Sequence, residues 1–306
     1  MDIFYPRWKL QMAMNQKLFS IISQLWCISL HHNPKDFDLS SNHKKEWNPK
    51  MHSFGPFDCS KGYIYMDRIG YRIPTELAKT IGTKSRPIQR SLTPHLDCCP
   101  PHTLHYSPGD KIDIDNNGNG NIPLLSKWRP LQSMISLTSN ERPNTGGFEA
   151  VKGFHQTFYE WTLNRLPTIR GDKSYPAPCI GQFTPIRPRE DRNVIEKMEH
   201  IPCKAGSVVI WDYRIPHANA RRNDSNESRA VIYASFLPDV DLNRRYVERQ
   251  LNDFRKNKHP TDQWIDPSEN DCDVDRVFQD DNEFTTFEKK LLGIEKWDTN
   301  TNESIK

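Results

Sequence analysis

Thirteen consecutive residues at positions 93–105, "TPHLDCCPPHTLH", bring together many side chains that could bind a metal. They are His95, Asp97, Cys98, Cys99, His102 and His105. Imidazoles with a carboxylate suit iron or zinc, whereas thiolates with imidazoles suit zinc. The segment is therefore half of an iron site, a compact zinc site, or a coincidence in a polar loop. A second segment is needed to choose among them.

The pair His95 and Asp97 has the spacing of two metal ligands on an extended segment. Successive side chains of a strand alternate between its sides, so residues two apart point the same way. An imidazole and a carboxylate thus reach one face without a special turn. The motif is weak alone, because a chain with eleven histidines yields about one such match by chance. A third ligand must come from elsewhere.

The second segment, residues 205–236, reads "AGSVVIWDYRIPHANARRNDSNESRAVIYASF". Its pattern predicts a strand, a proline-containing turn that fixes His217, a polar hairpin loop and a strand that opens with Arg229. Arg229 shares its strand face with Val231 and Tyr233, where a buried arginine is costly without an anion. A guanidinium can bind a carboxylate bidentately. Two histidines and one carboxylate with open positions are the ligands of non-haem Fe(II) oxygenases.

Three segments in this order resemble the phytanoyl-CoA dioxygenase-like family of Fe(II)/2-oxoglutarate-dependent oxygenases. They are "PHLD", "NTGGFEAVKGFHQ" and residues 205–236, and the resemblance covers roughly residues 85–240. It implies a mainly β fold, a double-stranded β-helix (a cupin-like jelly roll) with flanking α-helices and an N-terminal helical extension. It also implies that His95, Asp97 and His217 are the iron ligands.

The same resemblance implies residues that bind 2-oxoglutarate. Arg229 would hold the carboxylate that is farther from the iron. Asn219 lies two positions after His217, where the family often has a small polar residue that touches the cosubstrate; the usual residue there is Ser, so this chain departs from the pattern. Gln132 is a further candidate on the strand that follows the loop at 107–126, although alternation alone does not say which face it uses.

The implied activity is that of a dioxygenase, an oxidoreductase that hydroxylates a small organic substrate. Its cofactor would be Fe(2+), with 2-oxoglutarate as cosubstrate, O2 as oxidant and ascorbate as reductant, and it would release succinate and CO2. The cofactor supplies the chemistry in such enzymes, so we expect no catalytic side chain beyond the metal ligands.

Two alternatives remain. The first is a structural zinc bound by Cys98, Cys99, His102 and His105, although adjacent cysteines fit poorly with the usual spacing of zinc ligands. The second is a catalytically inactive jelly roll that serves as a binding or scaffold protein. A fold does not imply an activity, but an intact ligand set together with Arg229 favours catalysis.

The elements that must position these residues are short β-type runs, broken by proline and glycine, from residue 61 onward. They include 131–138, 206–213 and 229–238. Apolar spacing predicts helices at 18–30, at 153–166 and at 241–258. We therefore expect an N-terminal extension over 1–60, an oxygenase core over 61–240, and a C-terminal helix and tail over 241–306 packed on that core.

Composition limits the classes of partner. The 42 basic and 39 acidic residues nearly balance, so no nucleic-acid or anionic lipid surface is expected. No apolar run approaches the roughly 20 residues that span a bilayer, and no cleavage site follows residues 18–30. Seven cysteines without framework spacing suggest free thiols. These features predict a cytoplasmic protein whose partner is a small-molecule substrate.

Several other residues attract attention but are assigned no role in the site. The loop over 113–124 resembles a calcium loop, yet Leu124 stands where the bidentate glutamate belongs, so a loop without calcium is favoured. Arg187, Arg189 and Arg192 could meet an anionic substrate, but arginine is mostly exposed and a solvated surface is favoured. His155 takes the place of a structural histidine in the resembled family and is left out of the metal shell.

Overall fold

The computed structural model describes residues 3–30, 57–83, 89, 92–100, 103, 127–165, 168–170, 173–175, 183–260 and 281–297, with backbone alone at 168–170 and 173–175. The helices are α1 (Arg7–Ala13), α2 (Gln16–Ser29), α3 (Thr75–Ile81), α5 (Phe158–Asn164), α6 (Arg192–Ile195), α7 (Asp241–Arg255) and α8 (Thr286–Leu292), with the 3-10 turns η2 (Phe154–Gln156) and η3 (Asp281–Glu283). The strands are β1 (Gly62–Tyr65), β2 (Ile69–Arg72), β3 (His95–Leu96), β4 (Leu131–Ser136), β5 (Phe148–Ala150), β6 (Thr168–Arg170), β7 (Lys173–Tyr175), β8 (Thr184–Pro185), β9 (Glu199–His200), β10 (Val208–Asp212), β11 (His217–Asn219), β12 (Arg229–Tyr233) and β13 (Ser235–Pro238).

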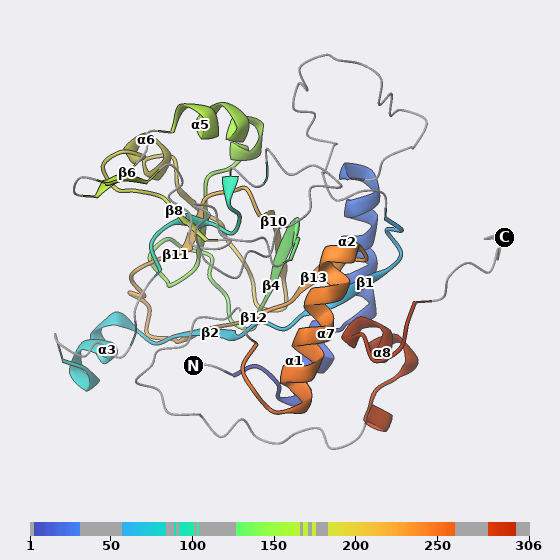
Figure 1. The fold of residues 1–306 in the computed structure, drawn as a ribbon. Helices are drawn as coiled ribbons and strands as arrows, with labels where there is room; N and C mark the ends of the chain where they lie inside the picture. The colour runs from blue at the N-terminus through green and yellow to red at the C-terminus, as the bar shows by residue number, and fades with distance from the viewer. Residues whose placement is uncertain are drawn as a thin grey trace, which may run out of the picture.

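Two antiparallel sheets form the centre of the molecule (Figure 1). One has the strand order β10-β4-β12-β2 and the other the order β8-β3-β11-β5-β9. A buried cluster with Met134 and Val231 from the first sheet and Phe148 and Ala150 from the second shows that their inner faces pack together. The described strands form no closed barrel. The result is a mixed structure in which antiparallel sheets carry helices on the outside.

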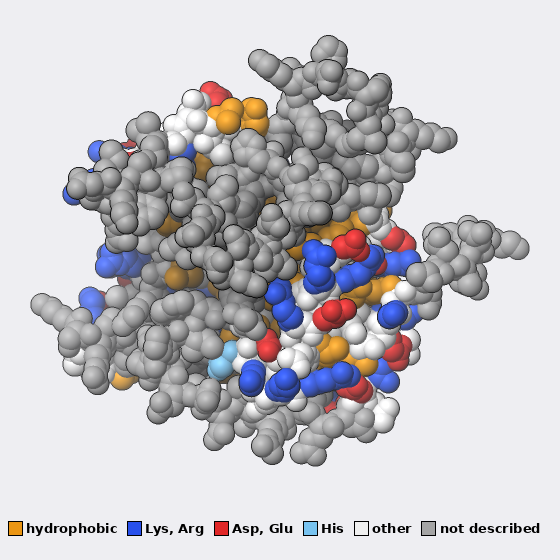
Figure 2. Space-filling model, in the orientation of Figure 1, with side chains coloured by type: hydrophobic (Ala, Val, Ile, Leu, Met, Phe, Trp, Pro, Cys, Tyr) orange, Lys and Arg blue, Asp and Glu red, His pale blue; other side chains and the backbone are white. Residues whose placement is uncertain are grey.

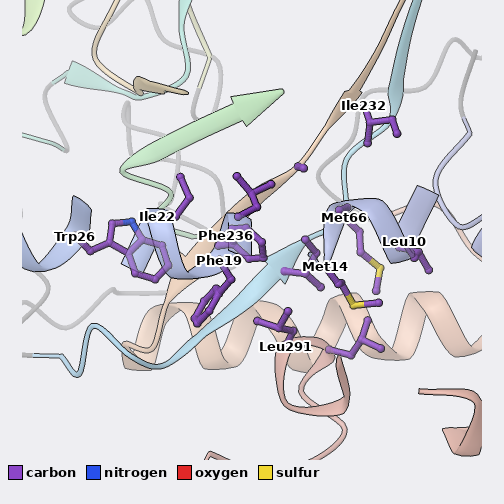
Figure 3. Close-up of a cluster of buried hydrophobic side chains, with 14 of the residues drawn as sticks. Leu10, Met14, Phe19, Ile22, Trp26, Met66, Ile232, Phe236 and Leu291 are labelled. Atoms are coloured by element: carbon purple, nitrogen blue, oxygen red, sulfur yellow. The ribbon is translucent and has the colours of Figure 1, made fainter. Parts of the chain in front are cut away.

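The helices α1, α2, α7 and α8 gather on one side of the sheets (Figure 1). Asn15 caps α2 by accepting hydrogen bonds from the backbone of the first turn. The apolar side of α2 then buries Phe19 and Trp26 against Phe236 of β13 and Leu291 of α8 (Figure 3). The predicted helix at 18–30 is confirmed, and the N-terminal segment shares one core with the C-terminal helices.

The other predicted elements are found with shifted ends. The expected helices at 153–166 and 241–258 correspond to η2 with α5 and to α7, and the runs 131–138 and 206–213 correspond to β4 and β10. The run 229–238 is not one strand, because it breaks at Ala234. Before the break β12 pairs with β4 and β2, and after it β13 pairs with β1.

The cysteines do not match the expectation of free thiols. Cys27 of α2 and Cys59 form a disulfide, with Cα atoms 5.6 Å apart, and Cys99 is also disulfide-bonded. The contact of Trp26 with Phe57, at 6.3 Å between ring centroids, brings the two segments together. Cys98 and Cys203 are buried free thiols. The expected cytoplasmic location loses the support of free thiols and stays a prediction.

The visible surface over α7 mixes both signs of charge, with Lys and Arg side chains next to Asp and Glu (Figure 2). Exposed residues of α7 such as Arg244, Arg245 and Glu248 alternate with the buried Tyr246 and Val247. Within the described ranges, no helix has both the length and the apolar character needed to cross a bilayer.

Lys9 of α1 is an unusual buried cation at the base of the helical layer. Its side chain is 1% exposed, and its Nζ donates to the backbone oxygen of Phe4 at 2.7 Å and to that of Asp67. Burial lowers the pKa of Lys9 from 10.5 to about 8, although the negative charge of Asp67 opposes the shift. The amine is thus easier to deprotonate in the folded chain than in the unfolded one.

We predict that Lys9 makes the protein more stable as pH rises from 8 to 10.5. Over that interval the unfolded chain binds a proton that the folded chain does not, so the free energy of unfolding increases with pH. The gain relative to Lys9→Met should be on the order of 3 kcal/mol. Urea denaturation of both proteins at several pH values measures the difference, and parallel pH profiles would contradict the prediction.

Candidate metal centre

Three of the predicted ligands lie together between the sheets. His95 of β3 and His217 of β11 are direct partners in the antiparallel register, and Asp97 follows β3 by one residue. The Nε2 atoms of His95 and His217 lie 3.6 Å and 3.4 Å from the two carboxylate oxygens of Asp97. One ligand atom from each residue lies within 4.8 Å of the others, and no other such group of His, Cys, Asp or Glu occurs in the described ranges.

Backbone carbonyls fix the tautomers of both histidines. The Nδ1 of His95 lies 2.8 Å from the oxygen of Thr93, and the Nδ1 of His217 lies 2.9 Å from the oxygen of Ile215. A carbonyl oxygen only accepts hydrogen bonds, so each Nδ1 carries the proton in a neutral ring. Each Nε2 therefore keeps its lone pair and turns it toward Asp97, which is the arrangement of histidines that bind a metal.

The electrostatics of the three residues suit a divalent cation. Burial, reinforced by the neighbouring His217, lowers the pKa of His95 from 6.5 to about 4. Burial alone would raise the pKa of Asp97, but the neighbouring His217 and His95 and the charge of Arg129 outweigh it and hold that pKa well below its usual range. At neutral pH an anionic carboxylate thus lies beside the neutral His95 imidazole.

Aromatic rings enclose the two histidines. Phe183 stacks on His95, with ring centroids 4.7 Å apart, and Trp211 lies 5.3 Å from His217. Phe148 stacks on His217, with ring centroids 5.6 Å apart. These contacts limit the rotation of both imidazoles, which are buried, whereas the Asp97 side chain is partly exposed.

Buried polar atoms without partners surround the same centre. The Nε2 of Gln132, the Nε1 of Trp211 and the Oδ1 of Asn219 are buried and lack a hydrogen-bond partner in the described part of the chain. Gln132 and Trp211 are register partners across β4 and β10, so both face the same side of the sheet. Unpaired buried polar atoms are costly, so their presence near His217 points to a polar ligand.

Arg229 of β12 is 3% exposed, and no described carboxylate forms an ion pair with it. Its Nη2 lies 3.3 Å from the sulfur of Met134. Its register partner is Arg72 of β2, also buried. Burial, and then the nearby charge of Arg229, lower the pKa of Arg72. Two guanidinium groups thus share one inner face, where an anion would offset their charge.

Tyr233 adds a hydroxyl to this pair. A Cβ on Gly70 would lie 3.2 Å from the Tyr233 hydroxyl oxygen and 2.8 Å from Val231 Cγ2, so only glycine leaves room for the ring at that position. The Nδ2 of Asn219 donates to the Tyr233 hydroxyl at 3.0 Å, which leaves the O–H of Tyr233 to donate elsewhere.

The sequence led to Arg229, Gln132 and Asn219 but missed Arg72, Tyr233 and Trp211. Alternation in "IGYRIP" shows that Arg72 and Gly70 share a face, but it does not indicate which strand lies beside them. Strand pairing alone carries that information.

The zinc alternative fails at Cys99, because a sulfur in a disulfide is not a thiolate ligand. Burial also raises the pKa of the Cys98 thiol, which opposes the thiolate form. His102 and His105 lie outside the described residues, as does the loop over 113–124. His155 belongs to no group of potential metal ligands in the described ranges, consistent with its omission from the shell.

The expectation of a solvated surface is wrong for Arg187 and holds for Arg189 and Arg192, which are exposed. Arg187 is buried because its Nε donates to Asp191 at 3.0 Å. Arg165 Nη2 donates to the same carboxylate at 2.8 Å. This buried group supports the segment around β8.

Comparison with known proteins gives one family match. The family model described as Gig2-like matches residues 126–283, just over half of the chain. This range contains His217 and Arg229 but begins after His95 and Asp97. The expected phytanoyl-CoA dioxygenase-like family is therefore not the family whose model matches.

The phytanoyl-CoA dioxygenase likeness is present in part. A Dictyostelium discoideum protein named "Putative phytanoyl-CoA dioxygenase" is 25% identical over 150 residues, 48% of this chain. The aligned part is 37% of that protein, so the chain spans little more than a third of the curated relative it matches.

Solved structures show the same fold at low identity. The crystal structure of GlcNAc Inducible Gene 2, GIG2 (DUF1479), from Candida albicans has a TM-score of 0.68 and 16% identity, covering 99% of this chain and 68% of that one. The hypothetical protein JW0805 from Escherichia coli has a TM-score of 0.61 and 19% identity, covering 95% of this chain and 69% of that one.

We predict that the protein binds one divalent ion through the three residues, and that Asp97→Asn or His217→Ala weakens binding by more than about 100-fold. Loss of a ligand should cost more than loss of a group that only orients one. Titration calorimetry with Mn(II) measures the affinity. His155→Gln is the matched control and should bind as the wild type does; equal losses in control and ligand variants would contradict the assignment.

Proposed function

The chain belongs to the Gig2-like family, and from its metal centre we propose that it is an Fe(II)- and 2-oxoglutarate-dependent dioxygenase. One observation carries the proposal: two histidines with their Nε2 lone pairs fixed toward one carboxylate lie on one of two sheets whose inner faces pack together, and a buried arginine without an acidic partner among the described residues lies on the other. The ligands suit iron with open positions, and the arginine suits an anion.

The strand order supports a double-stranded β-helix as the scaffold. Along the chain, β2, β3, β4 and β5 alternate between the two sheets, and β9, β10, β11 and β12 do the same. Such alternation winds two antiparallel sheets around one interior, as in a jelly roll. We propose this description for the core, with the metal centre at the interior end of β3 and β11.

His95, Asp97 and His217 would hold the iron. When bound, iron and 2-oxoglutarate supply the activation of O2 that hydroxylates a substrate, with release of succinate and CO2. The residues of this chain would orient the iron ligands and surround the site. Thr93 and Ile215 keep both imidazoles in the binding tautomer, and the surrounding rings limit their rotation.

Arg229, Arg72 and Tyr233 would bind the distal carboxylate of 2-oxoglutarate. The two guanidinium groups give charge, and the hydroxyl gives a further donor. Gln132, Trp211 and Asn219 lie nearer to His217, and their unpaired atoms would meet the polar groups of the cosubstrate or of a small organic substrate. A catalytically inactive binding protein would have no need of both the three metal ligands and the buried arginines.

We predict slow formation of succinate from 2-oxoglutarate by anaerobically purified protein given Fe(II), ascorbate and then air. His217→Ala should abolish it, since one of the three ligands is lost. Chromatography of succinate measures the turnover, with His155→Gln as a control that retains it. A wild-type protein that binds one Fe(II) yet makes no succinate would contradict the dioxygenase and favour a binding role.

We also predict that the arginine pair recognises a dicarboxylate. Arg229→Gln should weaken 2-oxoglutarate binding to the Mn(II) protein by about 100-fold, and Arg72→Gln by about tenfold, because each removes a charged hydrogen bond. Binding of 2-oxopentanoate, which has a methyl group in place of the distal carboxylate, should change in neither variant. Calorimetry measures both ligands. Equal losses for the two ligands would mean a general disturbance of the site.

A further inference from the structure

Arg129 links the proposed metal ligand Asp97 to a second carboxylate. It comes two residues before β4, and its guanidinium lies 3.4 Å from Asp97 Oδ2 through Nη2 and 3.3 Å from Asp67 Oδ2 through Nη1. The side chain is 12% exposed and lies over the ring of Tyr65 at 4.3 Å. Sequence reasoning missed it, because no motif joins residues 67, 97 and 129.

Asp67 is held on its other side. Its Oδ1 accepts a hydrogen bond from the backbone of Arg68 at 2.8 Å, and its backbone oxygen accepts one from the buried Lys9. Met66, the preceding residue, donates its backbone N–H to Gln250 of α7 at 2.8 Å. The segment that carries Asp67 is thus fixed by both α1 and α7, and Arg129 has a rigid anchor.

The ion pair of Arg129 with Asp67 can orient Asp97 without changing the net charge beside the candidate metal site. The positive charge of Arg129 is offset by Asp67, so the group of Asp67, Arg129 and Asp97 carries the same net charge as Asp97 alone. A lone arginine at this position would repel a divalent cation. An arginine paired with a second carboxylate can hold Asp97 in place while the centre keeps its negative charge.

We infer that Arg129 is a positioning residue that restrains Asp97 to bind the metal through one oxygen. A hydrogen bond from the guanidinium to Oδ2 disfavours the binding of both carboxylate oxygens to one ion. Two imidazoles and one oxygen would then leave three positions of a six-coordinate ion open, whereas a chelating carboxylate would leave two. The third position is the one that a metal with a bidentate cosubstrate would need for O2.

This inference rests on the proposed function only in requiring a metal at His95, Asp97 and His217. Its test therefore uses Mn(II) and water alone. The relaxation rate of water protons reports the number of water molecules that exchange on bound Mn(II), which is a property of coordination and not of turnover. Affinity is measured in the same titration.

We predict that Arg129→Met binds Mn(II) at least as tightly as the wild type but lowers the relaxation of water per bound ion by about a third, from three open positions to two. Methionine retains an apolar stem over Tyr65. Arg129→Lys, with one donor group, should restore part of the loss. Arg192→Met, which removes an exposed arginine paired with Glu196, is the matched control and should change nothing.

Two outcomes overturn the inference. Unchanged affinity and unchanged relaxation in Arg129→Met would mean that Asp97 needs no restraint. Loss of Mn(II) binding by a folded Arg129→Met would mean that Arg129 merely supports the ligand strand. A wild type that binds Mn(II) but not 2-oxoglutarate would refute the proposed function and leave this comparison valid.

Asp67→Asn keeps the inference testable where Arg129→Met does not fold. The amide retains an acceptor for Arg68, but the charge of Arg129 is no longer offset. We expect Mn(II) affinity to fall severalfold, because an uncompensated cation then lies beside the site. Unchanged affinity in Asp67→Asn would contradict the charge balance on which the positioning role depends.

Discussion

The antiparallel register of β3 and β11 is the constraint on which the centre depends. It sets His95 opposite His217, although they are separated by more than a hundred residues. A shift of either strand by one residue would turn its histidine to the other face of the sheet. Because the side chains of β3 alternate, the same register also aims Asp97 at the two imidazoles. The candidate metal centre is thus a consequence of strand pairing.

The second constraint is that polar groups buried between the sheets must find partners. The backbone satisfies the Nδ1 atoms of both histidines, and Asp191 forms ion pairs with Arg165 and Arg187. On the inner face near Arg229, the described protein provides no carboxylate. A fold that buries donors without acceptors is costly by itself. A bound anion would offset this cost, and the proposed function places one there.

Sequence reasoning predicted the features that depend on strand alternation and on local motifs. It predicted the main helices and most strands, and it singled out His95, Asp97 and His217, which the structure brings within reach of one ion. It missed Arg72, Tyr233 and Arg129, whose positions depend on which strands lie side by side. The expectation of a free thiol is wrong for Cys27, because its disulfide with Cys59 depends on a tertiary contact between α2 and the segment at 57–59. The burial of Arg187 was missed for the same reason, because it depends on the tertiary contacts around its ion pair with Asp191.

The two halves of the centre are supported in different ways. His217 and Arg229 lie within the range matched by the Gig2-like model, on strands that pair on both sides. His95 lies before that range on β3, which has only two residues and cannot define its own position. It is held by β8, where Thr184 Oγ1 donates to the Cys98 oxygen at 2.7 Å.

The buried arginines of the β8 segment and Arg129 then have a common physical role. Arg165 donates to the Pro185 oxygen at 2.6 Å and to Asp191, which fixes β8, and β8 fixes β3 from its free edge. Arg129 donates to Asp97, the carboxylate that follows β3. A ligand strand too short to be stable alone is therefore positioned by charged contacts around it. The precision of the centre depends on those contacts as much as on the three ligands.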